Sequence, residues 1–278
     1  MRVRYDVMRD VAVAADELGV ESVWLPEHLI WPADLGGLSP HADGHAPVDP
    51  TIPTLDTLMV LVDLAAITSR VRLGTYVYNL ALRHPFVSAR AVQTLDHLSG
   101  GRVELGIGAG WLEGEWLAAG LDFATRGRRL DECIDVLRCL WTAEQPCYDG
   151  EFVSFGPVRF EPKPLQAPLP ISVGGESRAA LRRAARRGDG WIGMDHDPAS
   201  AARQVAALRR ECAEAGRDPT EVVVSVGGAA ADLDTVRAFA AAGVDRLIVA
   251  PWRRSADAVV GLTAYVDEVV APWRAEVG

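Results

Sequence analysis

The stretch VRLGTYVYNLALRHPFVSARAVQTLDHLSGGRVELGIGAGW, residues 71–111, decides the fold class. Its first part, residues 71–77, is rich in β-branched and aromatic residues, which suit a buried strand. Pro85 opens a helix whose apolar residues recur at helical spacing until a glycine pair ends it. Residues 102–107 form the next predicted strand. The stretch therefore predicts a βαβ unit with two parallel strands, whose following loops lie at one edge of the sheet.

The rest of the chain repeats this alternation of strands and helices. Seven strands are predicted, near residues 21–25, 71–77, 102–107, 170–173, 190–194, 222–226 and 245–250. Alternation with helices indicates a parallel sheet. A closed TIM or (β/α)8 barrel needs eight strands, and only residues 1–5, MRVRY, are available for the missing first one. We therefore expect an α/β barrel whose first strand is vestigial or absent.

Two segments interrupt this rhythm. Residues 31–53 are rich in proline and show no period, which indicates a long loop insertion. Residues 147–168 contain four prolines and alternate as YDGEFVSFGPVRFEP, which predicts a β-hairpin insertion. We expect one domain over residues 1–278 that carries both insertions.

Composition excludes several classes of protein. The formal net charge of −10 argues against nucleic acid or an anionic membrane as a partner. No apolar run reaches the roughly 18 residues of a membrane span. The four cysteines and six histidines show no metal-type spacing, so no metal site is expected. No signal peptide is visible, and we expect a cytoplasmic protein with free thiols.

Three features follow predicted strands directly. His28 can exchange a proton near neutral pH, although a lone histidine is more often a surface or core residue. Residues 108–110, Gly-Ala-Gly, form either a tight turn or a place where a ligand approaches the backbone. Residues 174–177, Gly-Gly-Glu-Ser, open a helix and predict either a phosphate site or a plain N-cap by Ser177.

Four stretches together carry a resemblance to a known family. They are GVESVWLPEHL at 19–29, the unit at 71–111, RGRRLDECIDVLRCLW at 126–141 and PLPISVGGESRAALRRAARRGDGWIG at 168–193. The chain resembles the bacterial luciferase-like monooxygenase superfamily, and within it the branch of oxidoreductases that use the deazaflavin coenzyme F420. The resemblance implies a (β/α)8 barrel with the cofactor at its carboxyl-terminal mouth. It also implies hydride transfer between F420 and an organic small-molecule substrate that the sequence does not identify.

The resemblance also assigns residues. It implies a cofactor site formed by Glu27, His28, Tyr76, Val77, Asn79, Ala109, Gly110, Gly174, Gly175, Glu176 and Met194. His28 would be the catalytic residue that manages a proton as hydride moves. Tyr76 and Val77 match a bulge where the family often has a non-prolyl cis peptide. An aromatic substrate pocket is expected from Trp31, Tyr78 and Trp111, with ordinary core packing as the alternative for at least one of them.

Two alternatives stay open. The first is an FMN-dependent monooxygenase on the same fold, and the second is a degenerate, non-catalytic barrel, which the missing strand favours. Trp111 stands where the F420-dependent sugar-phosphate dehydrogenases carry a glutamate, and this argues against that substrate class. Because family members are commonly dimers, the resemblance also implies a homodimer.

Overall fold

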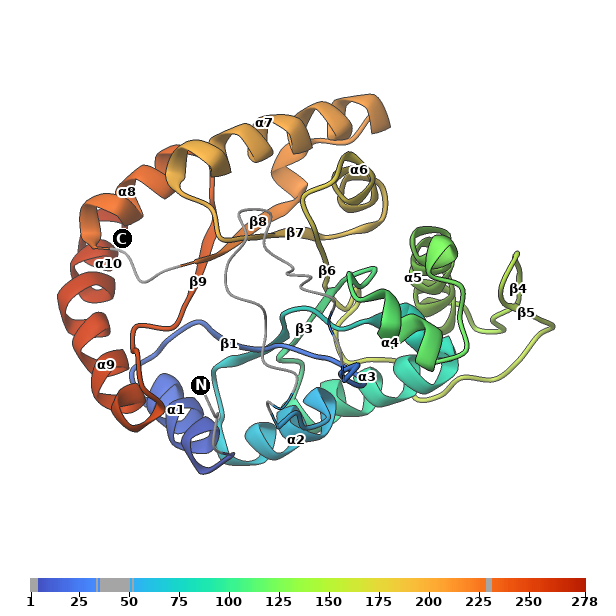
Figure 1. Cartoon of the computed structure of the whole chain (residues 1–278), viewed down its shortest axis with the longest axis horizontal. Coiled ribbons are helices and arrows are strands. Elements are labelled where there is room, and N and C mark those ends of the chain that lie inside the picture. Colours follow the sequence, from blue (N-terminus) through green and yellow to red (C-terminus); the bar gives the residue numbers. More distant parts are fainter. Residues whose placement is uncertain (1–4, 34, 36–50, 52, 229–231) are drawn as a thin grey trace.

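A nearly closed barrel of parallel strands forms the centre of the molecule (Figure 1). The computed structural model describes residues 5–33, 35, 51, 53–228 and 232–278. Within these residues the barrel has seven strands, in the order β1 (Ser22–Leu25), β2 (Arg72–Thr75), β3 (Val103–Ile107), β6 (Ile171–Gly174), β7 (Gly190–Met194), β8 (Val223–Gly228) and β9 (Arg246–Val249). Each pair of neighbours is parallel, so the predicted strand count and direction are confirmed.

Helices surround these strands (Figure 1). The larger ones are α1 (Tyr5–Glu17), α2 (Thr57–Ile67), α3 (Pro85–Ser99), α5 (Arg126–Thr142), α6 (Arg178–Arg187), α7 (Pro198–Ala215), α8 (Leu233–Ala241), α9 (Ala258–Tyr265), the π-helix η5 (Val266–Val270) and α10 (Ala271–Val277). Short helical segments are α4 (Glu113–Ala118), η1 (Leu80–Leu82), η2 (Phe123–Thr125), η3 (Pro219–Glu221) and η4 (Ser255–Asp257). No helix in the described part of the chain is long and apolar enough to cross a membrane.

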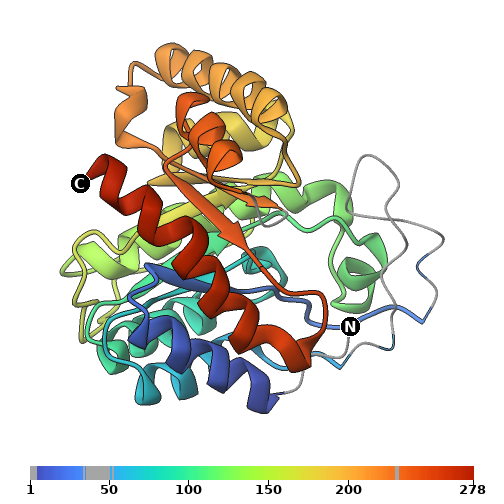
Figure 2. The same ribbon diagram turned by 90° about the vertical axis from the view of Figure 1, so that its left-hand side faces the viewer.

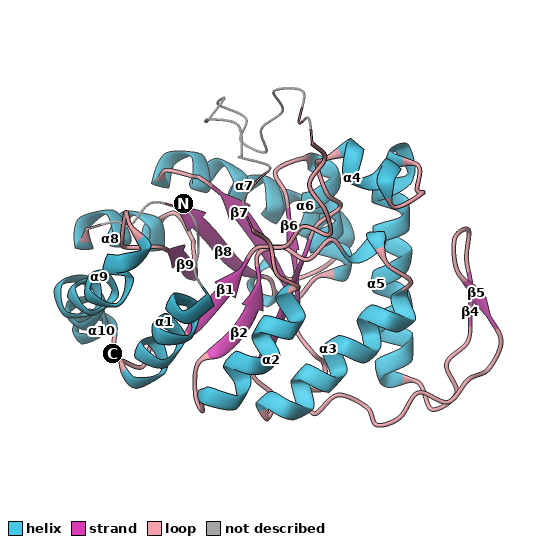
Figure 3. Ribbon diagram, turned by 60° about the horizontal axis from the view of Figure 1, so that its bottom comes forward, coloured by secondary structure: helices cyan, strands magenta, loops and turns pink. Residues whose placement is uncertain are grey.

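The two predicted insertions have different outcomes. The hairpin is present as antiparallel β4 (Tyr148–Asp149) and β5 (Ser154–Phe155), and it projects beyond α5 (Figure 3). The loop predicted over 31–53 lies mostly outside the described residues, which omit 34, 36–50 and 52. The stub strand predicted over 1–5 also lies outside them, except for Tyr5, which already belongs to α1.

The barrel is open between β1 and β9, which are not paired with each other. Every residue of these two strands is half-buried, whereas every residue of β3 is buried, because each open edge lacks a neighbour. On the outside, α9 packs against α1 across the gap (Figure 2). Within the described residues, the barrel therefore has an open seam between β1 and β9.

Arg246 on β9 spans the seam from the inside. Its guanidinium donates to Glu21, just before β1, at 2.8 and 3.0 Å, and to Glu104 on β3 at 2.7 Å. Arg72 on β2 reaches the same Glu104 at 3.3 Å. Because β9 and β3 are not neighbours, these contacts run through the barrel interior. An ion network thus links the two edges where a strand would otherwise lie.

Asp16 joins the end of α1 to the start of β2. Its buried carboxylate accepts backbone N–H bonds from Ser69 at 3.0 Å, Arg70 at 2.6 Å and Val71 at 2.7 Å. Burial by itself raises the pKa of Asp16, but these hydrogen bonds outweigh it and lower the pKa to about 2. The ionised carboxylate is therefore part of what holds the first βα connection together.

Asp16→Asn is expected to destabilise the protein in a pH-dependent way. The stabilisation is fully present above the unfolded-state pKa near 4 and is lost as pH falls towards 2, because folding depresses this pKa. The variant should therefore lose about 2 kcal/mol of unfolding free energy at pH 7 and almost none at pH 2. Urea unfolding across this range measures the difference, with Asp10→Asn on the exposed part of α1 as the control. An equal loss at both pH values would contradict this account.

Candidate functional site

The loops after β2 and β3 lie side by side at the carboxyl end of the barrel. The Gly108 N–H donates to the Tyr78 carbonyl at 3.1 Å, and Tyr78 forms a parallel bridge with Ile107. Gly100 ends α3 with φ of 69°, and Pro85 opens it. The βαβ unit and the common edge of its two loops are therefore confirmed.

His28 lies at this edge, immediately after β1. Its Nδ1 is 3.2 Å from Oε2 of Glu115, and 13% of its side chain is exposed. The Trp31 ring packs on the imidazole with centroids 3.9 Å apart, and Trp111 meets it edge-on at 5.8 Å. Its Nε2 has no hydrogen-bond partner in the described part of the chain and is not a buried atom. His28 thus has one nitrogen held by a carboxylate and the other open.

Glu115 is a functional candidate that the sequence reasoning missed. It lies on α4, has 0% exposure, and its Oε1 accepts the N–H groups of Leu29 at 2.6 Å and Ile30 at 3.3 Å. Glu113, on the same helix, is exposed. The sequence held one signal for this role. Glu115 is an acidic residue next to Trp116, on the apolar face of a short helix that follows a glycine turn.

Glu27, which the resemblance assigns to the cofactor site, has both of its carboxylate oxygens engaged by other residues of the chain. The carboxylate is 1% exposed, with Oε1 2.7 Å from Nη2 of Arg83 and Oε2 accepting the Asn79 N–H at 2.8 Å. Asn79 is itself buried, and its Nδ2 lies 3.5 Å from Glu115. Glu27 and Asn79 therefore lie behind the mouth, where they fix the loop after β2.

Tyr78 follows the alternative of ordinary core packing that was predicted for at least one of the three aromatic residues. It is 2% exposed and belongs to the hydrophobic core. Its hydroxyl lies 3.3 Å from Ser88 on α3, and the Arg83 guanidinium lies 4.6 Å from its ring centroid. Burial raises the pKa of Tyr78, so the phenol stays neutral. It is a core residue, not a wall of a substrate pocket.

Val77 forms the floor of the mouth. A Cβ at Gly108 would lie 2.6 Å from one Val77 methyl, and a Cβ at Gly174 would lie 2.8 Å from the other. The valine therefore rests directly on the backbone at the ends of β3 and β6. The Tyr76–Val77 peptide is cis, as the resemblance predicts. Val77 and Ala109 are both half-buried apolar residues at this end of the barrel.

Gly110 closes the same turn. Its φ of 75° lies in the left-handed region, and a Cβ there would lie 2.8 Å from Nε1 of Trp116. Glycine is therefore required both for the turn and for the close approach of α4. This approach is what brings Glu115 against His28.

The opposite side of the mouth carries a second polar group. Glu176 accepts the Met194 N–H at 2.9 Å and lies 2.8 Å from Nε2 of His196. A Cβ at Gly227 would lie 2.1 Å from the Tyr76 hydroxyl, so Tyr76 reaches across to β8. Burial, then the charges of Asp195 and Glu176, raise the pKa of Tyr76.

Residues 174–177, predicted as either a phosphate site or an N-cap, lead into the start of α6. Ser177 is the N-cap and accepts the Ala180 N–H at 3.2 Å, as the second alternative predicted. Gly174 is half-buried and Gly175 is exposed, so backbone groups at this turn are accessible. The Glu176 side chain, by contrast, is held against the end of β7.

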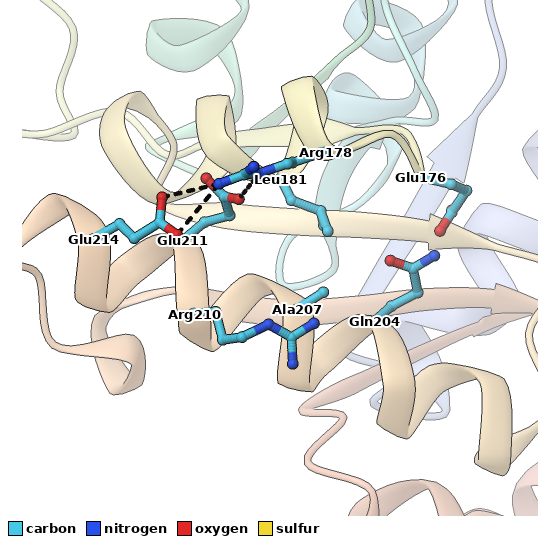
Figure 4. A pocket seen from close by; sticks show the side chains of 8 residues that line it. All are labelled: Glu176, Arg178, Leu181, Gln204, Ala207, Arg210, Glu211 and Glu214. Atoms are coloured by element: carbon cyan, nitrogen blue, oxygen red, sulfur yellow. Dashed lines mark hydrogen bonds and ion pairs between the residues drawn. The ribbon is translucent and has the colours of Figure 1, made fainter.

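A crevice of about 290 Å³ lies between α6 and α7 (Figure 4). On one side, Arg178 bonds Glu211 at 2.6 Å and Glu214 at 3.1 Å. Glu176 and Gln204 line its other end. The crevice lies between helices outside the barrel and shares only Glu176 with the predicted site.

Comparisons with known proteins agree with this fold. Residues 2–265 match the model of the luciferase-like monooxygenase family. An uncharacterised protein of Mycobacterium tuberculosis is 35% identical over 259 residues, which cover 92% of this chain and 90% of that protein. An F420-dependent glucose-6-phosphate dehydrogenase of Kineococcus radiotolerans is 38% identical over 198 residues, or 68% of this chain and 53% of that enzyme.

Solved structures share the architecture. An F420-dependent secondary alcohol dehydrogenase in complex with an F420–acetone adduct has a TM-score of 0.78 and 17% identity, covering 96% of this chain and 95% of the other. A monooxygenase of Streptomyces bottropensis has a TM-score of 0.76 and 22% identity, covering 97% and 93%. At these identities the likeness shows the fold. The match to the family model shows that the chain belongs to the luciferase-like monooxygenase family, whose members are flavin or deazaflavin oxidoreductases.

Proposed function

We propose that the protein is an F420-dependent oxidoreductase that transfers hydride between the deazaflavin and an apolar organic substrate. The observation that carries the proposal is His28 at the carboxyl end of β1, with Nδ1 held by Glu115 and Nε2 without a hydrogen-bond partner among the described residues. The 38% identity to an F420-dependent dehydrogenase supports the choice of cofactor, although this chain spans about half of that relative.

Bound F420 would supply the carbon that accepts or donates hydride. The chain supplies the setting for that chemistry. Val77 and Ala109 would support the flat ring, and the partly exposed turn at Gly174 and Gly175, which opens α6, would lie near the phosphate. Nε2 of His28 would take the substrate proton on oxidation and return it on reduction.

The substrate class follows from the residues around His28. Trp31 and Trp111 enclose the imidazole with aromatic surface, which excludes water and favours an apolar molecule. We do not propose a sugar phosphate as the substrate, because Trp111 stands where the F420-dependent sugar-phosphate dehydrogenases carry a glutamate. The proposal includes a homodimer, which light scattering of the purified protein tests.

Val77→Asp is expected to abolish cofactor binding, because it places a charge on the apolar floor between Gly108 and Gly174. Fluorescence quenching during titration with oxidised F420, and in parallel with FMN, measures this. The wild type should saturate with F420 in preference to FMN, and the variant should lose at least about tenfold in affinity. Val87→Asp, on the exposed face of α3, is the matched control.

The other outcomes are equally informative. A preference for FMN would replace the proposal with an FMN-dependent monooxygenase, which oxygen consumption would then test. Binding of neither cofactor by the folded wild type would support a degenerate barrel. Equal loss of affinity in the Val77 and Val87 variants would show that the floor is not where the ring lies.

A further inference from the structure

Glu115 is the most completely enclosed carboxylate near the mouth. It has 0% exposure, and four groups surround it. Oε1 accepts the backbone N–H groups of Leu29 and Ile30, at 2.6 and 3.3 Å. Oε2 faces Nδ1 of His28 at 3.2 Å and Nδ2 of Asn79 at 3.5 Å. The carboxylate therefore meets donors on both oxygens, and it cannot turn away without leaving them unpaired.

This arrangement dictates which nitrogen of His28 carries the proton. A carboxylate oxygen accepts hydrogen bonds and does not donate them, so Nδ1 must be the N–H donor. In the neutral ring, Nε2 then holds the lone pair. Packing of Trp31 on the ring at 3.9 Å restricts rotation of the imidazole. The open nitrogen is thus the basic one.

We propose that Glu115 is a positioning residue that sets the tautomer of His28 and presents Nε2 to the substrate. This role rests on the proposed function, in which a hydride leaves the substrate carbon with both electrons of its C–H bond. The proton of the adjoining O–H or N–H group then goes to Nε2, and a C=O or C=N double bond forms. The opposite tautomer has a hydrogen on Nε2 and cannot accept that proton.

The same contacts explain why α4 stands where it does. Gly110 lets α4 approach the barrel, and Trp116, with 0% exposure, fixes the helix in the core. Glu115 is therefore held by packing on its own helix and by hydrogen bonds from the loop after β1. Its position does not depend on a bound cofactor, so the tautomer can be measured on the free protein.

The test is ¹⁵N NMR of ring-labelled histidine at pH 9, where imidazoles are neutral. The His28 signals are assigned by their loss in His28→Gln. In the wild type, the protonated nitrogen should be Nδ1. In Glu115→Gln, the amide oxygen can still accept from Leu29 while the amide NH₂ faces Nδ1, so the hydrogen should move to Nε2. Loss of one charge-assisted hydrogen bond should change the tautomer ratio by about tenfold or more.

Glu113→Gln, an exposed change in the first turn of the same helix, is the control and should leave the ratio unchanged. A wild-type His28 protonated on Nε2 would overturn the proposal, even if Glu115→Gln failed to fold. An unchanged ratio in a folded Glu115→Gln protein, which a merely structural role predicts, would overturn it as well. Because these spectra need no cofactor, failure of F420 binding is a separate result.

Discussion

Glu27→Gln is expected to lower the free energy of unfolding by about 3 kcal/mol or more, because it leaves a buried arginine without its counter-charge. Arg83 and Glu27 have side chains that are 14% and 1% exposed, with 2.7 Å between Nη2 and Oε1. Burial by itself lowers the pKa of Arg83, but the hydrogen bond and charge of Glu27 outweigh it and raise the pKa. Because a guanidinium is not deprotonated in proteins, Arg83 keeps its charge when Glu27 is removed. Urea unfolding at pH 7 measures the loss.

The double variant Glu27→Gln/Arg83→Met distinguishes the cost of an unpaired buried charge from the loss of the ion pair itself. It should recover part of the stability lost in either single variant, because no unpaired charge remains in the core. The matched control is the surface pair Arg254–Asp257, which also has 2.7 Å between its atoms but has side chains 80% and 48% exposed. Asp257→Asn should leave the unfolding free energy almost unchanged. Equal losses in the buried and surface pairs would show that burial is not the cause.

Arg246→Met is expected to cost about 3 to 5 kcal/mol, because it removes the cation that spans the open seam. Glu104 is 5% exposed and would keep only Arg72, at 3.3 Å. Burial by itself lowers the pKa of Arg246, but Glu104 and then Glu21 outweigh it and raise the pKa. Thermal and urea unfolding measure the cost. Hydrogen exchange should show faster opening of β1 and β9 than of β3.

Glu21→Gln provides the internal comparison for the seam. Half of the Glu21 side chain is exposed, so water can replace Arg246 there, and the loss should be much smaller than for Arg246→Met. If Glu21→Gln lost as much unfolding free energy as Arg246→Met, the stabilising contact would be the one between Arg246 and Glu21 at the two edges, and not the one with the buried Glu104. Either result shows which contact of Arg246 stabilises the open seam.

Most of the fold was predictable because its signals are local. Short apolar segments between helical segments located each strand within a few residues. Glycine and proline marked the ends of helices such as α3. The side that Tyr78 faces could not be predicted for a local reason as well. Regular strand geometry ends at Thr75, so spacing could not tell that Val77 is half-buried at the mouth while Tyr78 is buried in the core.

The sequence by itself determined the parallel barrel, its seven strands, the family, and His28 at a strand end. Only the tertiary structure decided which partners these residues meet. Glu115 reaches His28 across 87 positions of sequence, and Arg246 reaches Glu21 across 225. No periodicity records such pairs, because they exist only once the strands close around a common interior and their ends lie at one edge.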